Sequence, residues 1–177
     1  MVIGHHLIFT AYGWWLPNDP RGSSSHEVRV ERIAELGDHH YGRKGMQPPR
    51  TDLRRFYEEA EQVLQHELLP FSPSDVETIA DAFAAVIAEQ RYTCYGCAIM
   101  MDHVHLLIRR HRDKAERMVS ILQGASRDLL IAREQRVADH RVWGGPGWKV
   151  FLSTQADMER IVQYIRDNPI KARQPAQ

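Results

Sequence analysis

Two strand-like runs, 92–101 and 104–108, follow one another between two stretches with the apolar spacing of helices, and this order admits few folds. Both runs contain the β-branched and aromatic residues that favour strands. Gly96 interrupts the first run, where it predicts a bulge or a bend. Consecutive strands flanked by helices indicate an α+β protein with an antiparallel sheet.

Both flanking helices have sequence signals for their first turn. Ser72 is expected to cap the first helix, with Pro73 at its first position and Asp75 reaching back to the cap. Apolar residues then continue at helical spacing to about Gln90. The second helix is expected to begin near Asp113, whose side chain would cap it.

One more strand precedes this core, and another strand and a last helix follow it. The strands are expected at 2–12 and 149–152. The last helix, capped by Ser153 or Thr154, is expected to run through Asn168 and to end at the proline that follows. The complete order predicts an antiparallel sheet covered by helices on one face, with the last helix packed on the sheet.

Residues 17–73 interrupt this pattern. They are rich in Gly, Pro, Asn and Ser, and contain one short predicted helix near 53–68. A chain of 177 residues is within the size of one domain. We therefore expect a single domain, 1–177, with an elaborated insertion at about 17–73.

The charge of the chain is unevenly distributed. Residues 1–108 hold 9 basic and 15 acidic residues, a net charge of −6, whereas residues 109–177 hold 14 and 8, a net charge of +6. The net charge of zero therefore does not exclude a nucleic-acid partner. The 19 Arg against 4 Lys favour bidentate contact with phosphates, although a biased base composition of the gene would give the same excess.

The sequence contains no signal for a membrane or for secretion. No stretch approaches the roughly 18 apolar residues of a membrane span, and the start lacks the pattern of a signal peptide. The two cysteines, Cys94 and Cys97, suit a reducing compartment. We expect a cytoplasmic protein with no membrane partner.

His103 and His105 are separated by one residue in a strand-like run, so both imidazoles should lie on one face. Such a pair can bind one divalent ion, although surface histidines on a half-exposed strand have the same spacing. Tyr164 and Asn168 lie four residues apart along the edge of the apolar stripe of the last helix. Both side chains would face the histidine pair, or else Tyr164 would only cover the core and Asn168 would only end the helix.

Three stretches of this chain together resemble one known family. They are Met100–Ile108 (MMDHVHLLI), Ile161–Pro169 (IVQYIRDNP) and Gly13–Gly22 (GWWLPNDPRG). In this order they resemble the HUH endonucleases, and among these the single-tyrosine, REP-associated transposases related to insertion-sequence transposases. The resemblance implies a ferredoxin-like or RRM-like sheet, and a C-terminal helix that carries the tyrosine.

The resemblance also implies a mechanism. His103 and His105 would bind Mg or Mn, with Asn168 or a neighbouring donor as third ligand, and the metal would polarise the scissile phosphate of single-stranded DNA. Tyr164 would be the catalytic nucleophile and would leave a free 3′-hydroxyl and a 5′-phosphotyrosine. The chain would then be a transposase-like endonuclease and strand transferase acting beside DNA hairpins.

The expected DNA contacts lie in the basic half of the chain, where ordinary solvated side chains would account for some of the charge. They are Arg109, Arg110, Arg112, Lys149, Arg160 and Lys171. A hairpin substrate places the protein at the nucleoid. Because the chain ends soon after the tyrosine helix, with no long tail to complete a partner's site, we expect a monomer rather than a dimer.

Two other functions fit parts of the sequence. Cys94, Cys97, His103 and His105 would be four zinc ligands within twelve residues, but the histidines are closer than in zinc fingers. A non-catalytic, RRM-like nucleic-acid-binding module would use the sheet and the basic half, and Tyr164 would then be structural.

Overall fold

The computed structural model describes residues 1–23, 31–42 and 44–173, except for the side chains of residues 31 and 170–173. The chain forms two compact units, one made of Met1–Ala11 with Pro70–Gln177 and the other of Tyr12–Leu69. Within the described residues, none of the helices is both long enough and apolar enough to span a lipid bilayer.

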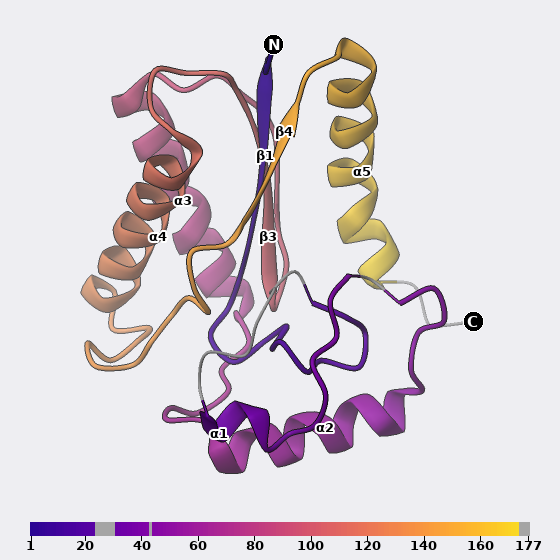
Figure 1. The fold of residues 1–177 in the computed structure, drawn as a ribbon. Helices are drawn as coiled ribbons and strands as arrows, with labels where there is room; N and C mark the ends of the chain where they lie inside the picture. Colours follow the sequence, from indigo (N-terminus) through magenta and orange to yellow (C-terminus); the bar gives the residue numbers. More distant parts are fainter. Residues whose placement is uncertain (24–30, 43, 174–177) are drawn as a thin grey trace. The chain divides into compact units, whose positions relative to one another are not determined.

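The first unit is built on a four-stranded sheet with the order β2-β3-β1-β4, and every neighbouring pair is antiparallel. Its strands are β1 (Gly4–Thr10), β2 (Cys94–Ile99), β3 (His103–Arg109) and β4 (Trp148–Leu152). Helices α3 (Pro73–Gln90) and α4 (Ala115–Ala132) cover one face, and α5 (Gln155–Arg173) lies on the other (Figure 1). This is the predicted α+β, ferredoxin-like arrangement.

Helix α3 begins where the sequence predicts. Ser72 Oγ accepts a hydrogen bond from the Asp75 backbone N–H at 3.1 Å, and the Asp75 carboxylate accepts one from the Ser72 N–H at 2.8 Å. Pro73 occupies the first turn, where the N–H that it lacks has no helical partner. The helix ends at Gln90, followed by Arg91 in a left-handed conformation. The predicted boundaries are confirmed because these signals are local.

The predicted cap of α4 is wrong. The residue that precedes the helix is Lys114, and no side chain caps the first turn. The Asp113 carboxylate instead accepts a hydrogen bond from the Tyr92 hydroxyl at 2.9 Å and lies 3.5 Å from Arg117. A donor 21 residues away and an arginine of the helix itself therefore occupy the carboxylate that a local pattern assigned to the cap.

Gly96 marks an irregularity in β2, as predicted. The pairing of β2 with β3 shifts register between Cys94 and Gly96. A Cβ atom added at Gly96 would lie 3.4 Å from Ile165 Cγ2 of α5, so a glycine lets this helix pack closely on the strand.

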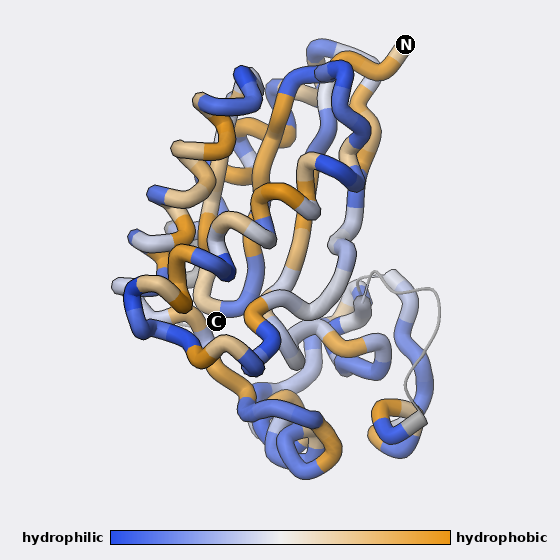
Figure 2. Tube along the Cα trace, turned by 90° about the vertical axis from the view of Figure 1, so that its left-hand side faces the viewer, coloured by the Kyte–Doolittle hydropathy of each residue, from blue (hydrophilic) through white to orange (hydrophobic). Residues whose placement is uncertain are grey.

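Apolar side chains of α3 and α4 pack on one face of the sheet. Figure 2 looks onto these helices and shows polar and apolar residues alternating along them, as amphipathic helices require. The strand residues that face them are at most 1% exposed: Leu7, Phe9, Val104, Leu106 and Ile108. A buried ion pair holds the start of α3 to the segment after α4, with Arg136 Nη2 2.8 Å from Asp75 Oδ2.

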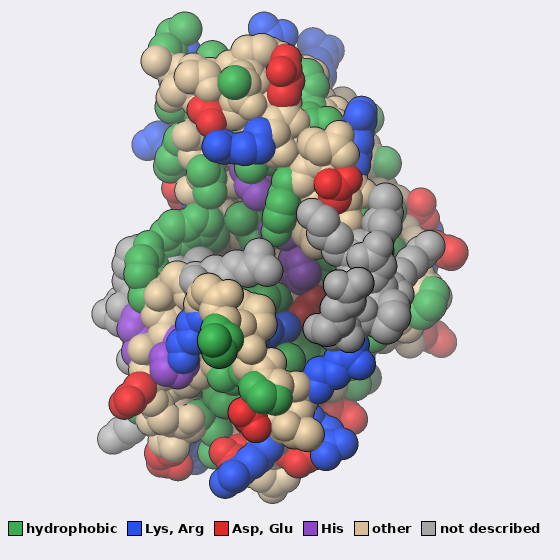
Figure 3. Space-filling view, turned by 90° about the vertical axis from the view of Figure 1, so that its right-hand side faces the viewer, with side chains coloured by type: hydrophobic (Ala, Val, Ile, Leu, Met, Phe, Trp, Pro, Cys, Tyr) green, Lys and Arg blue, Asp and Glu red, His purple; other side chains and the backbone are tan. Residues whose placement is uncertain are grey.

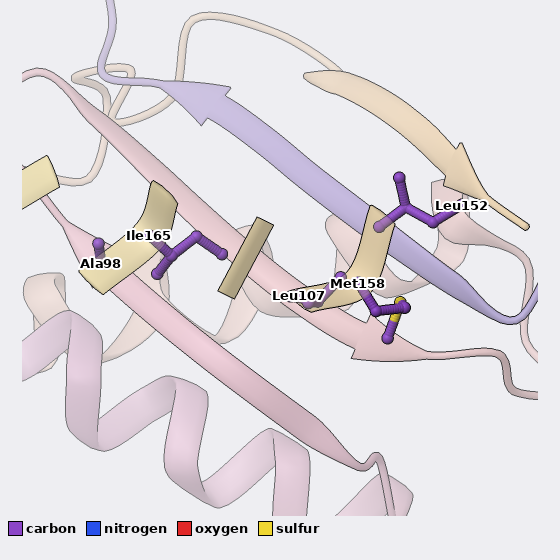
Figure 4. Close-up of a cluster of buried hydrophobic side chains, with 5 residues drawn as sticks. All are labelled: Ala98, Leu107, Leu152, Met158 and Ile165. Carbon is purple, nitrogen blue, oxygen red and sulfur yellow. The ribbon is translucent and has the colours of Figure 1, made fainter. Parts of the chain in front are cut away.

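A second apolar cluster holds α5 on the opposite face. Its buried members are Ala98, Leu107 and Leu152 from the sheet with Met158 and Ile165 from the helix (Figure 4). Gly4 permits the contact, because a Cβ atom there would lie 2.3 Å from Met158 Sδ. The sheet is thus buried on both faces in its centre.

Helix α5 begins as predicted and ends later than predicted. Thr154 Oγ1 accepts a hydrogen bond from the Asp157 N–H at 3.1 Å, which makes Thr154 the cap. Pro169 lies inside the helix, which continues to Arg173. Proline removes one hydrogen bond, the one to Ile165, and the helix passes through this loss.

The second unit contains α1 (Glu31–Ala34), which the sequence did not predict, and α2 (Arg50–Val63), which begins before the helix predicted near 53–68. The Tyr57 hydroxyl of α2 donates a hydrogen bond to the buried Asp19 carboxylate, and Arg21 Nη2 lies 2.8 Å from the same group. The core of this unit consists of Leu16, Phe56, Tyr57 and Ala60.

Candidate active site

His103 and His105 lie on the face of β3 that α5 covers. His105 is paired with Ile8 of β1 and Ala98 of β2. The centroids of the two imidazoles are 4.9 Å apart. Figure 3 looks onto the α5 side and shows histidine side chains reaching the surface there. The alternation of the strand therefore brings the two rings together.

Each imidazole has a hydrogen bond through its Nδ1 atom. His103 Nδ1 lies 2.6 Å from Asp102 Oδ1, and His105 Nδ1 lies 3.0 Å from His6 Nε2. A metal ion on this face would therefore be bound through the Nε2 atoms.

His6 is the residue of this site that sequence reasoning missed. It lies on β1, is 4% exposed, and its ring stacks on that of His105 with centroids 5.1 Å apart. An imidazole inside an apolar strand was a visible signal. Its partner depends on the β1–β3 register, which pairs His6 with Leu107 and cannot be deduced from the sequence of either strand alone.

Burial keeps His6 and His105 uncharged. It lowers the pKa of His6 to about 4. Burial, with His103 and His6 nearby, lowers the pKa of His105 to about 3. Both rings are therefore neutral at neutral pH, the form in which an imidazole binds a metal.

Tyr164 of α5 completes this cluster of rings. Its ring meets His105 edge-on with centroids 5.2 Å apart, and His6 with centroids 6.2 Å apart. The side chain is 38% exposed, so a substrate can reach it. The next residue, Ile165, is buried in the apolar cluster and fixes this turn of the helix on the sheet.

Asn168 lies one turn after Tyr164 on the same shoulder of α5. The helix runs antiparallel to β3, because Met158 packs at the end of the strand remote from the histidines. The turn that carries Asn168 therefore continues toward His103. Its Nδ2 atom is buried and has no hydrogen-bond partner among the described residues.

These residues suit a divalent cation. Rotating the Asn168 amide by half a turn would exchange its unpartnered nitrogen for an oxygen, a ligand that Mg and Mn accept. No three His, Cys, Asp or Glu side chains in the described part of the chain are placed to hold a metal ion. That Asn168 is the third ligand beside His103 and His105 stays a prediction.

The zinc alternative is wrong. Cys94 and Cys97 are paired with Ile108 and Leu106, whose side chains point toward α3 and α4. The two histidines point toward α5 instead. Side chains on opposite faces of a sheet cannot surround one ion.

The predicted basic residues do not form one surface. Arg110 and Arg112 are exposed in the segment after β3, and Arg160 pairs with an aspartate of its own helix at 2.8 Å. Lys149 is half-buried and lines a separate cavity beside α4. The side chain of Lys171 lies outside the described residues.

Arg109 faces a cavity of about 730 Å³ between α5 and the β2 edge of the sheet. This cavity lies on the shoulder of α5 opposite to Tyr164. Neither Arg109 nor Arg166 pairs with a carboxylate in the described part of the chain, and the Tyr95 ring is 45% exposed. The polar and aromatic side chains that line this cavity are Tyr95, Arg109, Gln155, Glu159, Gln163 and Arg166.

The family model of IS200-like transposases matches residues 65–168, which include both histidines and Tyr164. The chain belongs to the IS200-like transposase family. The resemblance seen in the motifs is thereby confirmed, and no curated protein matches the chain.

Two solved structures are similar to this transposase. A REP-associated tyrosine transposase bound to a REP hairpin has 9% sequence identity and a TM-score of 0.51, over 97% of this chain and 68% of that chain. A transposase candidate from Deinococcus radiodurans R1 has 14% identity and a TM-score of 0.46, over 94% and 91%. The first similarity supports the fold.

Proposed function

We propose that this IS200-like transposase cleaves and rejoins single-stranded DNA beside a hairpin, with Tyr164 as the nucleophile. The observation that carries the proposal is the edge contact between the Tyr164 ring and His105, 5.2 Å between centroids, on the face that holds both histidines. The REP hairpin bound by the similar transposase supports hairpin DNA as the substrate class.

The Tyr164 hydroxyl oxygen would attack the scissile phosphorus after losing its proton to solvent or to a base. A new P–O bond forms to the tyrosine, the P–O3′ bond breaks, and the 3′ oxygen takes up a proton and leaves as a hydroxyl. The phosphotyrosine retains the bond energy, so a second 3′-hydroxyl can reverse the step and join a different strand.

His103, His105 and Asn168 would hold a divalent cation, Mg or Mn, which would stabilise the charge that develops on the phosphate oxygens. Asp102 holds the His103 ring by its 2.6 Å hydrogen bond. Packing of Ile165 in the apolar cluster sets the height of the Tyr164 ring above the sheet.

Arg109 and Arg166 would bind phosphates of the same DNA, at a stretch of strand that passes the other shoulder of α5. Unpaired guanidinium groups attract an anion without first breaking an ion pair. The exposed Tyr95 ring offers a surface on which an unpaired base can stack. Phosphate charge and base stacking together favour single-stranded DNA at this cavity.

The nucleophile and the histidine pair belong to one chain in this arrangement, and α5 packs on its own sheet. One copy would therefore hold the proposed nucleophile and the proposed metal-binding residues together. We propose that the transposase acts as a monomer.

A non-catalytic RRM-like function is less consistent with this packing. RRM domains bind RNA bases on the open face of the sheet. Here that face is covered by α5, with Leu107 and Leu152 buried beneath Met158.

The test is the formation of a covalent adduct. The protein is incubated with Mg or Mn and with 5′- or 3′-labelled hairpin DNA from beside its own gene, and adducts are separated under denaturing conditions. We expect an adduct with the wild type, none with Tyr164→Phe, and none with His103→Ala combined with His105→Ala.

Tyr41→Phe is the matched control, since it removes the hydroxyl of an exposed tyrosine in the other unit. An adduct that persists in Tyr164→Phe would overturn the assignment of the nucleophile. Binding without cleavage under every metal condition would favour the non-catalytic function.

A further inference from the structure

We infer that His6 is a positioning residue that holds His105 in the tautomer able to bind the metal ion. This rests on the function proposed above and adds to it a residue from a strand that the family motifs do not include. The geometry that carries it is the pair of nitrogen atoms, His6 Nε2 and His105 Nδ1, 3.0 Å apart.

The packing of β1 on β3 accounts for the contact between His6 and His105. An imidazole without a partner is costly to bury, and His6 is 4% exposed, in a strand whose next three residues, Leu7, Ile8 and Phe9, are apolar. The β1–β3 register brings it to His105, 99 residues away in the sequence. The two rings lie 30° from parallel, so they stack in addition to forming this hydrogen bond.

A neutral imidazole has one N–H donor and one acceptor nitrogen. If His105 donates from Nδ1, its Nε2 atom keeps a lone pair and can bind a cation. If His6 donated instead, the proton of His105 would sit on Nε2 and block that atom. Metal binding therefore requires His6 to accept the hydrogen bond at Nε2 and to carry its own proton on Nδ1.

The two metal-binding histidines are thus oriented by different groups. His103 is held by the carboxylate of Asp102, whereas His105 is held by a neutral ring. An uncharged orienting group fixes the tautomer without adding a second negative charge beside a site that must accept a phosphate. The His6 ring also lies edge-on to the Tyr164 ring, so it packs against the nucleophile from the sheet side.

The first experiment reads the tautomer of His105 in metal-free protein by ¹⁵N NMR. We expect the Nδ1–H form in the wild type and in His6→Gln, whose amide oxygen can accept the same hydrogen bond. His6→Phe keeps a ring of similar size but has no acceptor, and should shift His105 toward the Nε2–H form. A His105 spectrum unchanged in His6→Phe overturns the inference.

The second experiment measures Mn binding by calorimetry or by EPR. His6→Phe should weaken the affinity by roughly 10- to 100-fold, as the loss of such an orienting partner does in other metal sites, and His6→Gln should restore most of it. His5→Phe is the matched control, because His5 lies in the same strand on the opposite face and packs edge-on to Phe151. Equal Mn affinity of His6→Phe and wild type overturns the inference.

The two proposals fail in different ways. If the wild type forms a Tyr164-dependent adduct while His6→Phe binds Mn normally, the function stands and the role of His6 is lost. If no adduct forms under any condition, the NMR experiment still decides whether His6 sets the tautomer. If His6→Phe does not fold, His6→Gln and His6→Asn, with their different reach to His105, provide the comparison of tautomer and affinity.

Discussion

Arg109 and Arg166 form no ion pair with the described residues, and removing both should change the salt dependence of DNA binding by a calculable amount. Each phosphate neutralised on a single strand contributes about 0.7 to the slope of log K against log salt, so Arg109→Gln with Arg166→Gln should lower that slope by about 1.4. Between 50 and 200 mM salt the wild type should therefore lose about sevenfold more affinity than the double variant.

The assay is fluorescence anisotropy with a labelled hairpin that carries single-stranded flanks, titrated at several NaCl concentrations. Lys114→Gln with Arg117→Gln removes the same charge from the start of α4, on the opposite face of the sheet, and should leave the slope unchanged. Equal slopes for the wild type and the Arg109/Arg166 variant would refute the assignment of this cavity. An equal fall in the α4 control would show that only net charge matters.

Three further predictions concern the stability of the sheet unit. Arg136→Met leaves its aspartate partner buried and unpaired, which should cost about 3–5 kcal/mol and be visible as a lower thermal midpoint; an unchanged midpoint would contradict the buried ion pair. Gly4→Ala should destabilise the sheet unit by about 1–3 kcal/mol, because its methyl group would clash with Met158. In urea unfolding, adding Met158→Ala should remove most of this loss of stability. If the two losses simply add, there is no direct clash. In the folded protein His6 and His105 have pKa values below the ordinary 6.5. Their contribution to stability is therefore complete above pH 6.5 and is lost as the pH falls toward 4. In that window the free energy of unfolding should fall by about 1.4 kcal/mol per pH unit for each histidine. Urea titrations of metal-free protein at pH 7 and pH 5 measure this, and a difference between wild type and His6→Gln that is constant across these pH values would contradict it.

Local patterns in the sequence predicted local structure correctly. Ser72 and Asp75 are three residues apart, and their hydrogen bonds form within one turn, so nothing distant competes with them. The alternation of β3 likewise places His103 and His105 on one face wherever the strand lies in the sheet. Where the local signal had a distant competitor, as at Asp113, the prediction failed.

By itself, the sequence determined the order of the strands and helices of the sheet unit, the family, the paired histidines, and the placement of Tyr164 and Asn168 on one side of α5. Only the tertiary structure decided that His6 meets His105, and that Arg109 and Arg166 line one cavity, where neither forms an ion pair among the residues that the structure describes. The periods of a helix and of a strand depend on residues a few positions apart, so the sequence of each segment is enough to predict which residues share a face. Register and helix placement come from the packing of both faces of the sheet at once, and that packing depends on residues from the whole unit.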